Sequence, residues 1–100
     1  MTEGYNALAE AEQLLLAAET DWRQARPAAV AALRALLLEW SVTPRGDSVV
    51  ELLEQTAETD DTLLEFRSEA RVLDRFEETP DAAERAKIFV DAARGRLANI

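Results

Sequence analysis

Histidine and cysteine are both missing from the 100 residues of this sequence. These two residue types supply most protein nucleophiles, zinc ligands and proton carriers near neutral pH. Their absence excludes a Ser-His-Asp triad, a cysteine nucleophile and a Cys/His zinc site. We therefore expect a binding module with no catalytic residue, no bound metal and no cofactor.

Helix-breaking residues are also scarce, with three prolines and three glycines. Because no long alternating run of β-branched residues occurs either, the pattern predicts an all-α chain. The apolar stretches are much shorter than a membrane span, and the first residues lack the pattern of a signal peptide. The expectation is one domain over residues 1–100, located in the cytoplasm.

Acidic residues outnumber basic ones by 20 to 11, which leaves a net charge of -9. Nucleic-acid affinity depends largely on cationic side chains that displace counterions from phosphates. We therefore do not expect a general DNA- or RNA-binding role.

Apolar residues recur at helical spacing in five segments, which predicts an up-and-down four-helix bundle with an additional short helix. Short connections between long helices favour antiparallel neighbours. The expected helices cover about residues 3–24, 27–41, 49–57, 63–76 and 80–97. Their expected inward residues include Leu8, Ala11, Leu15, Ala18 and Trp22 in the first, Leu63, Phe66, Ala70, Leu73 and Phe76 in the fourth, and Ala82, Ala86, Phe89, Ala93 and Leu97 in the fifth.

Three helix starts carry recognisable capping patterns. Residues 48–51 (Ser-Val-Val-Glu) have the form of a capping box, in which the serine oxygen accepts from a backbone N–H and the glutamate reaches back. Residues 62–65 (Thr-Leu-Leu-Glu) repeat this form at the fourth helix. Residues 79–81 (Thr-Pro-Asp) supply an N-cap, a first-turn proline and a carboxylate for the fifth.

The second expected helix is apolar almost all round and is interrupted mainly by Arg34 and Glu39. A helix of this kind has to be central in the fold or covered on its second side by another subunit. We expect an exposed strip of this helix, with Leu33, Leu37 and Trp40, to join two copies into a homodimer.

Arg67, Arg71 and Arg75 recur every four residues and predict a guanidinium stripe along one face of the fourth helix. Such a stripe could bind phosphates or a carboxylate-rich partner. The alternative is that these arginines pair with Glu65, Glu69, Asp74 and acids of adjacent helices.

Two pairs of carboxylates, Glu51 with Glu54 and Glu78 with Asp81, resemble the pattern of all-α nucleoside triphosphate pyrophosphatases of the MazG and dUTPase-like group. Carboxylates one turn apart on facing helices can hold magnesium, which would orient a triphosphate. A magnesium-dependent pyrophosphatase is therefore the alternative function. Pro80 lies inside the second pair and argues against a shared helix face.

The order of features along most of the chain resembles the HEPN domain family (higher eukaryotes and prokaryotes nucleotide-binding). Residues 28–38 (AAVAALRALLL) are similar to the alanine- and leucine-rich second helix of that family. Residues 44–53 (PRGDSVVELL) resemble its loop and short leucine-rich helix. Residues 73–76 (LDRF) followed by 79–81 (TPD) are similar to its aromatic-proline-aspartate junction.

The resemblance implies a helical bundle that dimerises and often works beside a small nucleotidyltransferase, within systems of the toxin-antitoxin kind. Ribonuclease members carry an arginine followed by a histidine, and this chain has no histidine to complete that motif. Asp47 stands where many relatives have histidine, and we include it with the arginine stripe among the partner-binding candidates. The expected function is a non-catalytic module that self-associates and binds a partner protein.

Overall fold

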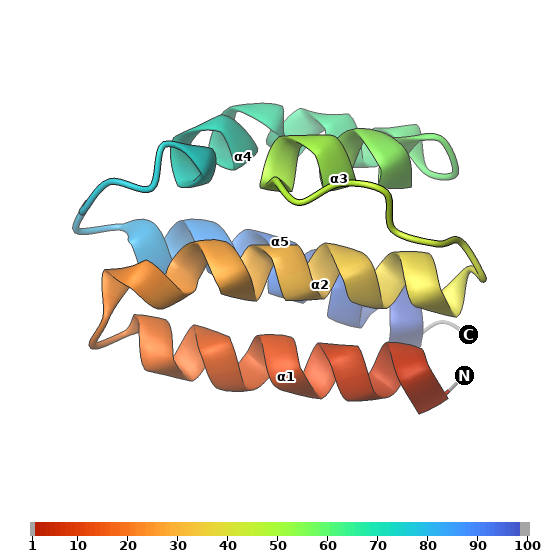
Figure 1. Ribbon diagram of the computed structural model, residues 1–100, viewed down its shortest axis with the longest axis horizontal. Coiled ribbons are helices and arrows are strands. Elements are labelled where there is room, and N and C mark those ends of the chain that lie inside the picture. Colours follow the sequence, from red (N-terminus) through yellow and green to blue (C-terminus); the bar gives the residue numbers. More distant parts are fainter. Residues whose placement is uncertain (1, 99–100) are drawn as a thin grey trace.

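The computed structural model describes residues 2–98, which form five α-helices and two 3₁₀ helices (Figure 1). The α-helices are α1 (Thr2–Ala18), α2 (Ala25–Glu39), α3 (Val49–Ala57), α4 (Arg67–Asp74) and α5 (Ala82–Ala98), and the 3₁₀ helices are η1 (Trp22–Gln24) and η2 (Asp61–Phe66). The prediction of an all-α chain with five helices is confirmed. Within the described range no helix has both the length and the apolar character that crossing a bilayer requires.

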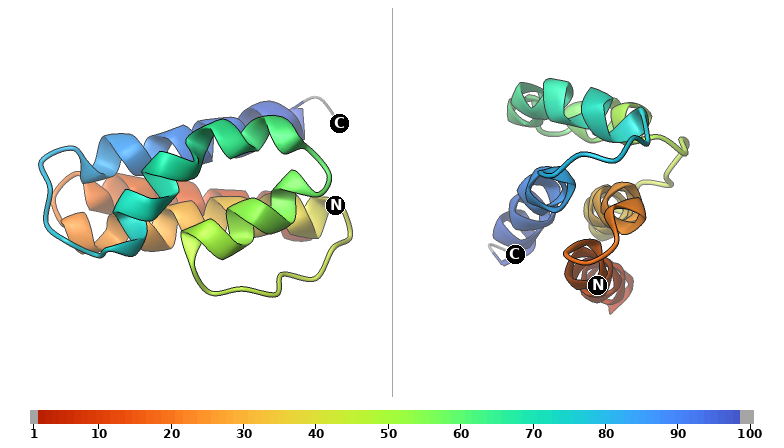
Figure 2. Two further views of the ribbon diagram at one scale, coloured as in Figure 1. Left: turned by 90° about the horizontal axis from the view of Figure 1, so that it is seen from above. Right: turned by 90° about the vertical axis from the view of Figure 1, so that its left-hand side faces the viewer.

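The helices are arranged in layers around α2 (Figure 2). α3 and α4 lie together on one side, α2 and α5 form the middle of the molecule, and α1 lies against the opposite side. The colours of Figure 1 show that α1 runs antiparallel to α2 and α5, whereas α2 and α5 run in the same direction.

Burial of α2 on almost all sides explains these layers. Only Arg34 among residues 25–40 is exposed, and Leu33, Leu36 and Leu37 are at most 1% exposed. Six residues of α2 are alanines and one is Val30, and these small side chains let neighbouring helices approach closely. The sequence-based prediction of a central second helix is therefore confirmed, and the chain covers this helix with its own residues.

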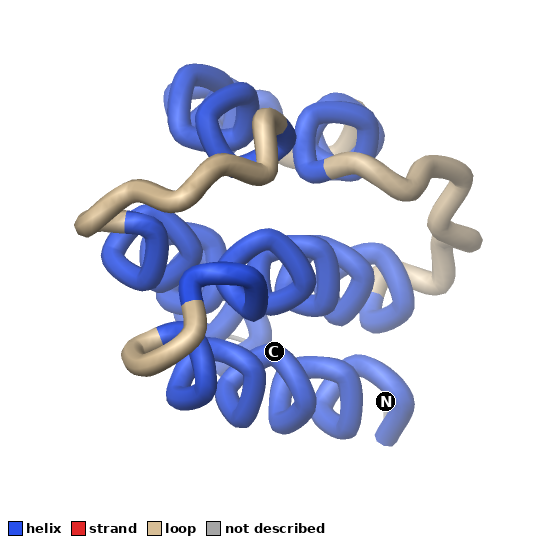
Figure 3. Tube along the Cα trace, turned by 60° about the vertical axis from the view of Figure 1, so that its left-hand side comes forward, coloured by secondary structure: helices blue, strands red, loops and turns tan. Residues whose placement is uncertain are grey.

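A long loop over residues 40–48 returns from the end of α2 to the start of α3 (Figure 3). α2 and α3 consequently run in the same general direction. The buried Gln55 holds the loop, because its amide donates to the carbonyl of Thr43 (2.7 Å) and its side-chain oxygen accepts from the N–H of Arg45 (2.9 Å). A polar side chain of α3 thus ties the loop to the body of the molecule.

The N-terminus of α3 is capped twice. Ser48 and Glu51 form the predicted capping box. In addition, the carboxylate of Asp74, at the end of α4, accepts hydrogen bonds from the backbone N–H groups of Val49 and Val50 (both 2.9 Å). The same carboxylate accepts from Arg26 Nε of α2 (3.1 Å), so one acidic side chain joins α2, α3 and α4.

Two predicted helices are interrupted in the structure. α1 ends at Ala18, and the side chain of Asp21 accepts from the N–H of Arg23 to start η1. The fourth helix begins as η2, and its N-cap is Asp60, to which the N–H of Thr62 is bonded. The capping box predicted at Thr62 is therefore wrong. Short polar side chains that bind nearby backbone groups compete with continued α-helix at both places.

The ends of the last two α-helices also differ from the prediction. Phe76 is not inward: it follows α4 with a left-handed backbone (φ 52) and is 50% exposed. α5 begins at Ala82, two residues after Pro80. The inward face predicted for α5 is confirmed: Ala82, Ala86, Phe89, Ala93 and Leu97 are buried, and Val90 is buried beside them.

Replacing Asp74 with alanine tests the junction between α2, α3 and α4. The substitution leaves two partly buried N–H groups and Arg26 without their acceptor. We expect the free energy of unfolding to fall by about 2 kcal/mol. Urea denaturation measures the loss, and Asp61→Ala, at an exposed position of η2, should change stability by less than about 0.5 kcal/mol. Equal losses in the two variants would contradict this role.

Candidate functional site

The arginine stripe lies along α4, on the outer layer of the molecule. Arg67 approaches Glu54 of α3 (Nη2 to Oε2, 3.6 Å). Arg71 and Arg75 are exposed, and neither makes an ion pair with any residue in the described range. Two of the three predicted guanidinium groups are therefore available to an external anion.

Two of the three acids named in the alternative interpretation of this stripe, Glu69 and Asp74, have other partners. Glu69 binds Arg85 of α5, and Asp74 binds Arg26 of α2. Both carboxylates lie on the faces of α4 that pack against the inner helices, whereas Arg71 points to solvent. The interpretation that Glu69 and Asp74 pair with the stripe is therefore wrong, because these two carboxylates form ion pairs with arginines of α5 and α2 instead.

Asp47 lies in the loop between α2 and α3, and its side chain is 99% exposed. Its backbone carbonyl accepts from Arg26 Nη2 (3.2 Å), which anchors the loop while the carboxylate stays in solvent. The guanidinium of Arg34 is 3.9 Å away. Among the described residues no hydrogen bond or ion pair joins Asp47 to the arginine stripe.

The residues predicted for self-association are placed differently from our expectation. Leu33 is 1% exposed and Leu37 is fully buried, and both belong to the hydrophobic core. They cannot form an exposed strip because the neighbouring helices already cover them. Trp40 is half-buried and packs against the core. The assignment of Leu33 and Leu37 to a dimer face is therefore wrong.

The four carboxylates of the alternative magnesium site do not gather. Glu51 is engaged in the capping box of α3, and Asp81 pairs with Arg85. Over residues 2–98, no group of three or more acidic side chains is positioned to hold a metal ion. The predicted grouping of Glu51 and Glu54 with Glu78 and Asp81 is therefore wrong.

Two surface grooves were not predicted from the sequence. The first lies between α1 and α2 and encloses a volume of about 280 Å³. Its walls are mainly apolar and carry one acid, Glu10, and one base, Arg34. The apolar walls are Ala7, Leu14, Pro27, Val30, Ala31 and Leu38. We call this the α1–α2 groove.

The second groove lies between α1 and α5. It consists of two adjoining hollows of about 530 and 540 Å³, which share Glu19, Pro80 and Ala83 in their walls. Leu16 borders the first hollow and is 60% exposed, the largest exposed fraction among the large hydrophobic side chains of the described residues. We call the continuous hollow the α1–α5 groove.

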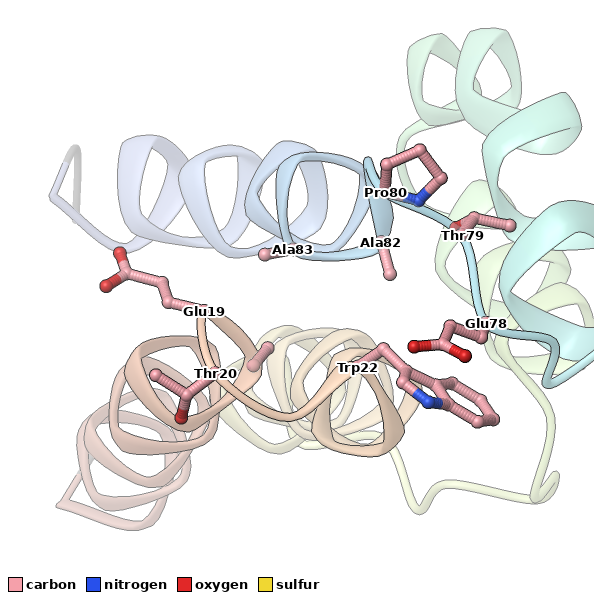
Figure 4. Close-up of a pocket in the computed structure, with 9 residues that line it drawn as sticks. Glu19, Thr20, Trp22, Glu78, Thr79, Pro80, Ala82 and Ala83 are labelled. Carbon is pink, nitrogen blue, oxygen red and sulfur yellow. The ribbon is translucent and has the colours of Figure 1, made fainter.

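Trp22 forms the wall at one end of the α1–α5 groove (Figure 4). The indole lies against the ring of Phe76, with the ring centroids 5.1 Å apart at an angle of 54°. Glu19 and Glu78 line the same hollow as Trp22 (Figure 4). The sequence predicted that Trp22 packs in the core, because its spacing fits a first helix that continues past it. In the structure α1 ends before Trp22 and η1 begins there, so the sequence pattern did not indicate a place for Trp22 at a groove wall.

The charges around the α1–α5 groove do not cancel. Two bases line the groove, and both are paired: Arg94 with Glu12 (3.3 Å) and Asp91, and Lys87 with Asp91 (3.7 Å). Glu19, Glu78 and Glu84 make no ion pair with any described residue. The unneutralised charge at the edge of this groove is therefore negative.

Arg85 holds the start of α5 beside this groove. Its guanidinium pairs with Asp81 (2.9 Å) and with Glu69 of α4. The hydrogen bond from Arg85 is the main cause that lowers the pKa of Asp81 below its ordinary value of 3.8. This anchor fixes residues 79–81, and with them Pro80 at the groove wall.

Comparisons with protein-family models, with curated proteins and with solved structures yield no match to this chain. The function therefore has to be inferred from these surfaces.

Substituting Asp81 with asparagine tests the anchor through its pH dependence. Since the folded-state pKa of Asp81 is lowered, its ion pair stabilises the fold above about pH 4 and is lost as the pH falls through the folded pKa. We expect Asp81→Asn to be less stable than the wild type near neutral pH and equally stable in strong acid. Thermal unfolding across this pH range measures the difference. The control Glu84→Gln, at an exposed acid without an ion pair, should show no difference of this form.

Proposed function

We propose that this chain is a non-catalytic, HEPN-like helical module that self-associates and binds a partner protein, such as a small nucleotidyltransferase. The lack of histidine and cysteine and the two apolar surface grooves support a binding role. A cytoplasmic location belongs to the same proposal and agrees with the lack of cysteine. Arg71, Arg75 and Asp47 remain exposed as contact points for such a partner.

The composition of the α1–α2 groove is the observation that carries this proposal. Leu14, Val30 and Leu38 offer partly buried apolar area that water still reaches. A two-fold axis brings the same patch of two copies face to face, which requires a patch that complements itself. Glu10 and Arg34 meet this requirement, because each can pair with the opposite charge of the second copy.

This interface still uses α2 for self-association, but it uses a different face of the helix from the one predicted from the sequence. Val30, Arg34 and Leu38 follow one another every four residues and therefore share one face of α2. That face lies beside α1 and is open to solvent, whereas the face with Leu33 and Leu37 is closed by the core. A second copy is the occupant that we assign to this groove.

A charge exchange tests the dimer. We expect light scattering at micromolar concentrations to give twice the chain mass of 11.1 kDa for the wild type. Glu10→Arg and Arg34→Glu should each shift the protein to the monomer mass, because like charges then meet across the axis. The double variant carrying both changes should recover the dimer.

Leu16→Glu is the matched control, since it introduces a charge on α1 outside the α1–α2 groove. This variant should keep the dimer mass. A wild-type protein that remains monomeric throughout the range, or a double variant that fails to recover while staying folded, would overturn self-association through this face.

A further inference from the structure

The α1–α5 groove has the shape of a site for one additional helix. α1 and α5 run antiparallel, and both pack against α2, so a helix laid between them on the open side would complete a group of four (Figure 2). The part of α1 from Glu12 to Ala18 spans about 9 Å at 1.5 Å per residue, and the hollow beside Trp22 extends the groove beyond the end of α1. The groove can therefore receive a helix of two to three turns.

The middle of the groove is apolar. Leu15, Leu16, Pro80 and Ala83 line it, and the exposed side chain of Leu16 stands at its edge. Side chains at positions i, i+3, i+4 and i+7 of a helix lie on one face and would cover these residues. An occupant with apolar residues at that spacing would remove Leu16 from water.

The edge of the groove is acidic. Glu19, Glu78 and Glu84 have no ion-pair partner among the described residues, and the net charge of -9 attracts cations from a distance. Lysine or arginine residues flanking the apolar face of an incoming helix would pair with these carboxylates.

The end of the groove at Trp22 adds a place for one cationic side chain. Trp22 and Glu78 both line the hollow at this end (Figure 4). A lysine or arginine in this hollow would have both an indole and a carboxylate in the walls around it, and these are groups that attract an organic cation. From these observations we infer that the α1–α5 groove binds a basic amphipathic helix of the partner protein. This inference rests on the proposed partner binding and specifies the partner's chemistry.

A second copy of this chain does not have the required chemistry. α4 is the helix with an exposed arginine stripe, but its apolar residues Ala70 and Leu73 are buried in the core. It cannot present an apolar face and a basic edge at the same time. The groove occupant is therefore a different chain, and the α1–α2 groove remains the face for self-association.

A helical peptide provides the probe. It has 14 residues, with leucine at positions 1, 4, 5, 8, 11 and 12 and lysine elsewhere, and a matched peptide carries glutamate in place of lysine. We expect calorimetric titration to show binding of the lysine peptide at least ten times tighter than that of the glutamate peptide. In a Trp40→Phe background the fluorescence of Trp22 should change on saturation, because Trp22 lines the site.

Charge-matched variants separate this groove from general attraction to an acidic protein. Glu19→Gln, Glu78→Gln and Glu84→Gln combined should weaken peptide binding at least tenfold. The control combination Glu54→Gln, Glu58→Gln and Glu65→Gln removes the same charge from exposed positions of α3, the turn after it and η2, and should weaken binding less than twofold. Leu16→Asn should also weaken binding, with circular dichroism confirming that each variant stays folded.

Equal losses in the two triple variants, equal binding of the two peptides, or an unchanged Trp22 signal at saturation would each overturn the inference. Repeating the titration on Arg34→Glu, which changes the α1–α2 groove, separates this result from self-association. If the wild-type protein is a monomer that binds the peptide, only the proposal of self-association is contradicted. If it is a dimer that does not bind the peptide, only the inference of a basic helical partner is contradicted.

Discussion

The burial of α2 is the constraint on which the rest of this fold depends. A helix with apolar residues on nearly every side is stable in water only when other helices surround it. α1 and α5 cover part of α2, and the layer of α3 and α4 covers the rest. Since Leu33, Leu36 and Leu37 are buried in this way, the apolar surfaces that we propose for binding are the two grooves along α1.

A small number of polar contacts determine how the covering layer is attached. The carboxylate of Asp74 binds the first N–H groups of α3 and the guanidinium of Arg26. Gln55 holds the returning loop through Thr43 and Arg45. These contacts satisfy partly buried backbone groups that would otherwise lose their hydrogen bonds to water.

Ion pairs within the fold also determine which charged side chains remain at the candidate binding surfaces. Glu69, Asp74 and Asp81 are held in contacts between or at the ends of helices. By contrast, Glu19 and Glu78 stand beside the α1–α5 groove without an ion-pair partner in the described residues, and Arg71 is open on α4. The acids and bases available to a partner are therefore those that folding did not pair.

The sequence by itself determined the helical class, the central position of the second helix, the capping box at Ser48 and the inward face of α5. Each of these follows from local spacing or from contacts within a few residues, which a sequence pattern records directly. Only the tertiary structure decided that Leu33 and Leu37 are internal, that Asp74 caps α3, and that Trp22 borders a groove. These features depend on which helices meet and on how a loop returns, and residues 25 or more positions apart meet through packing that no local spacing encodes.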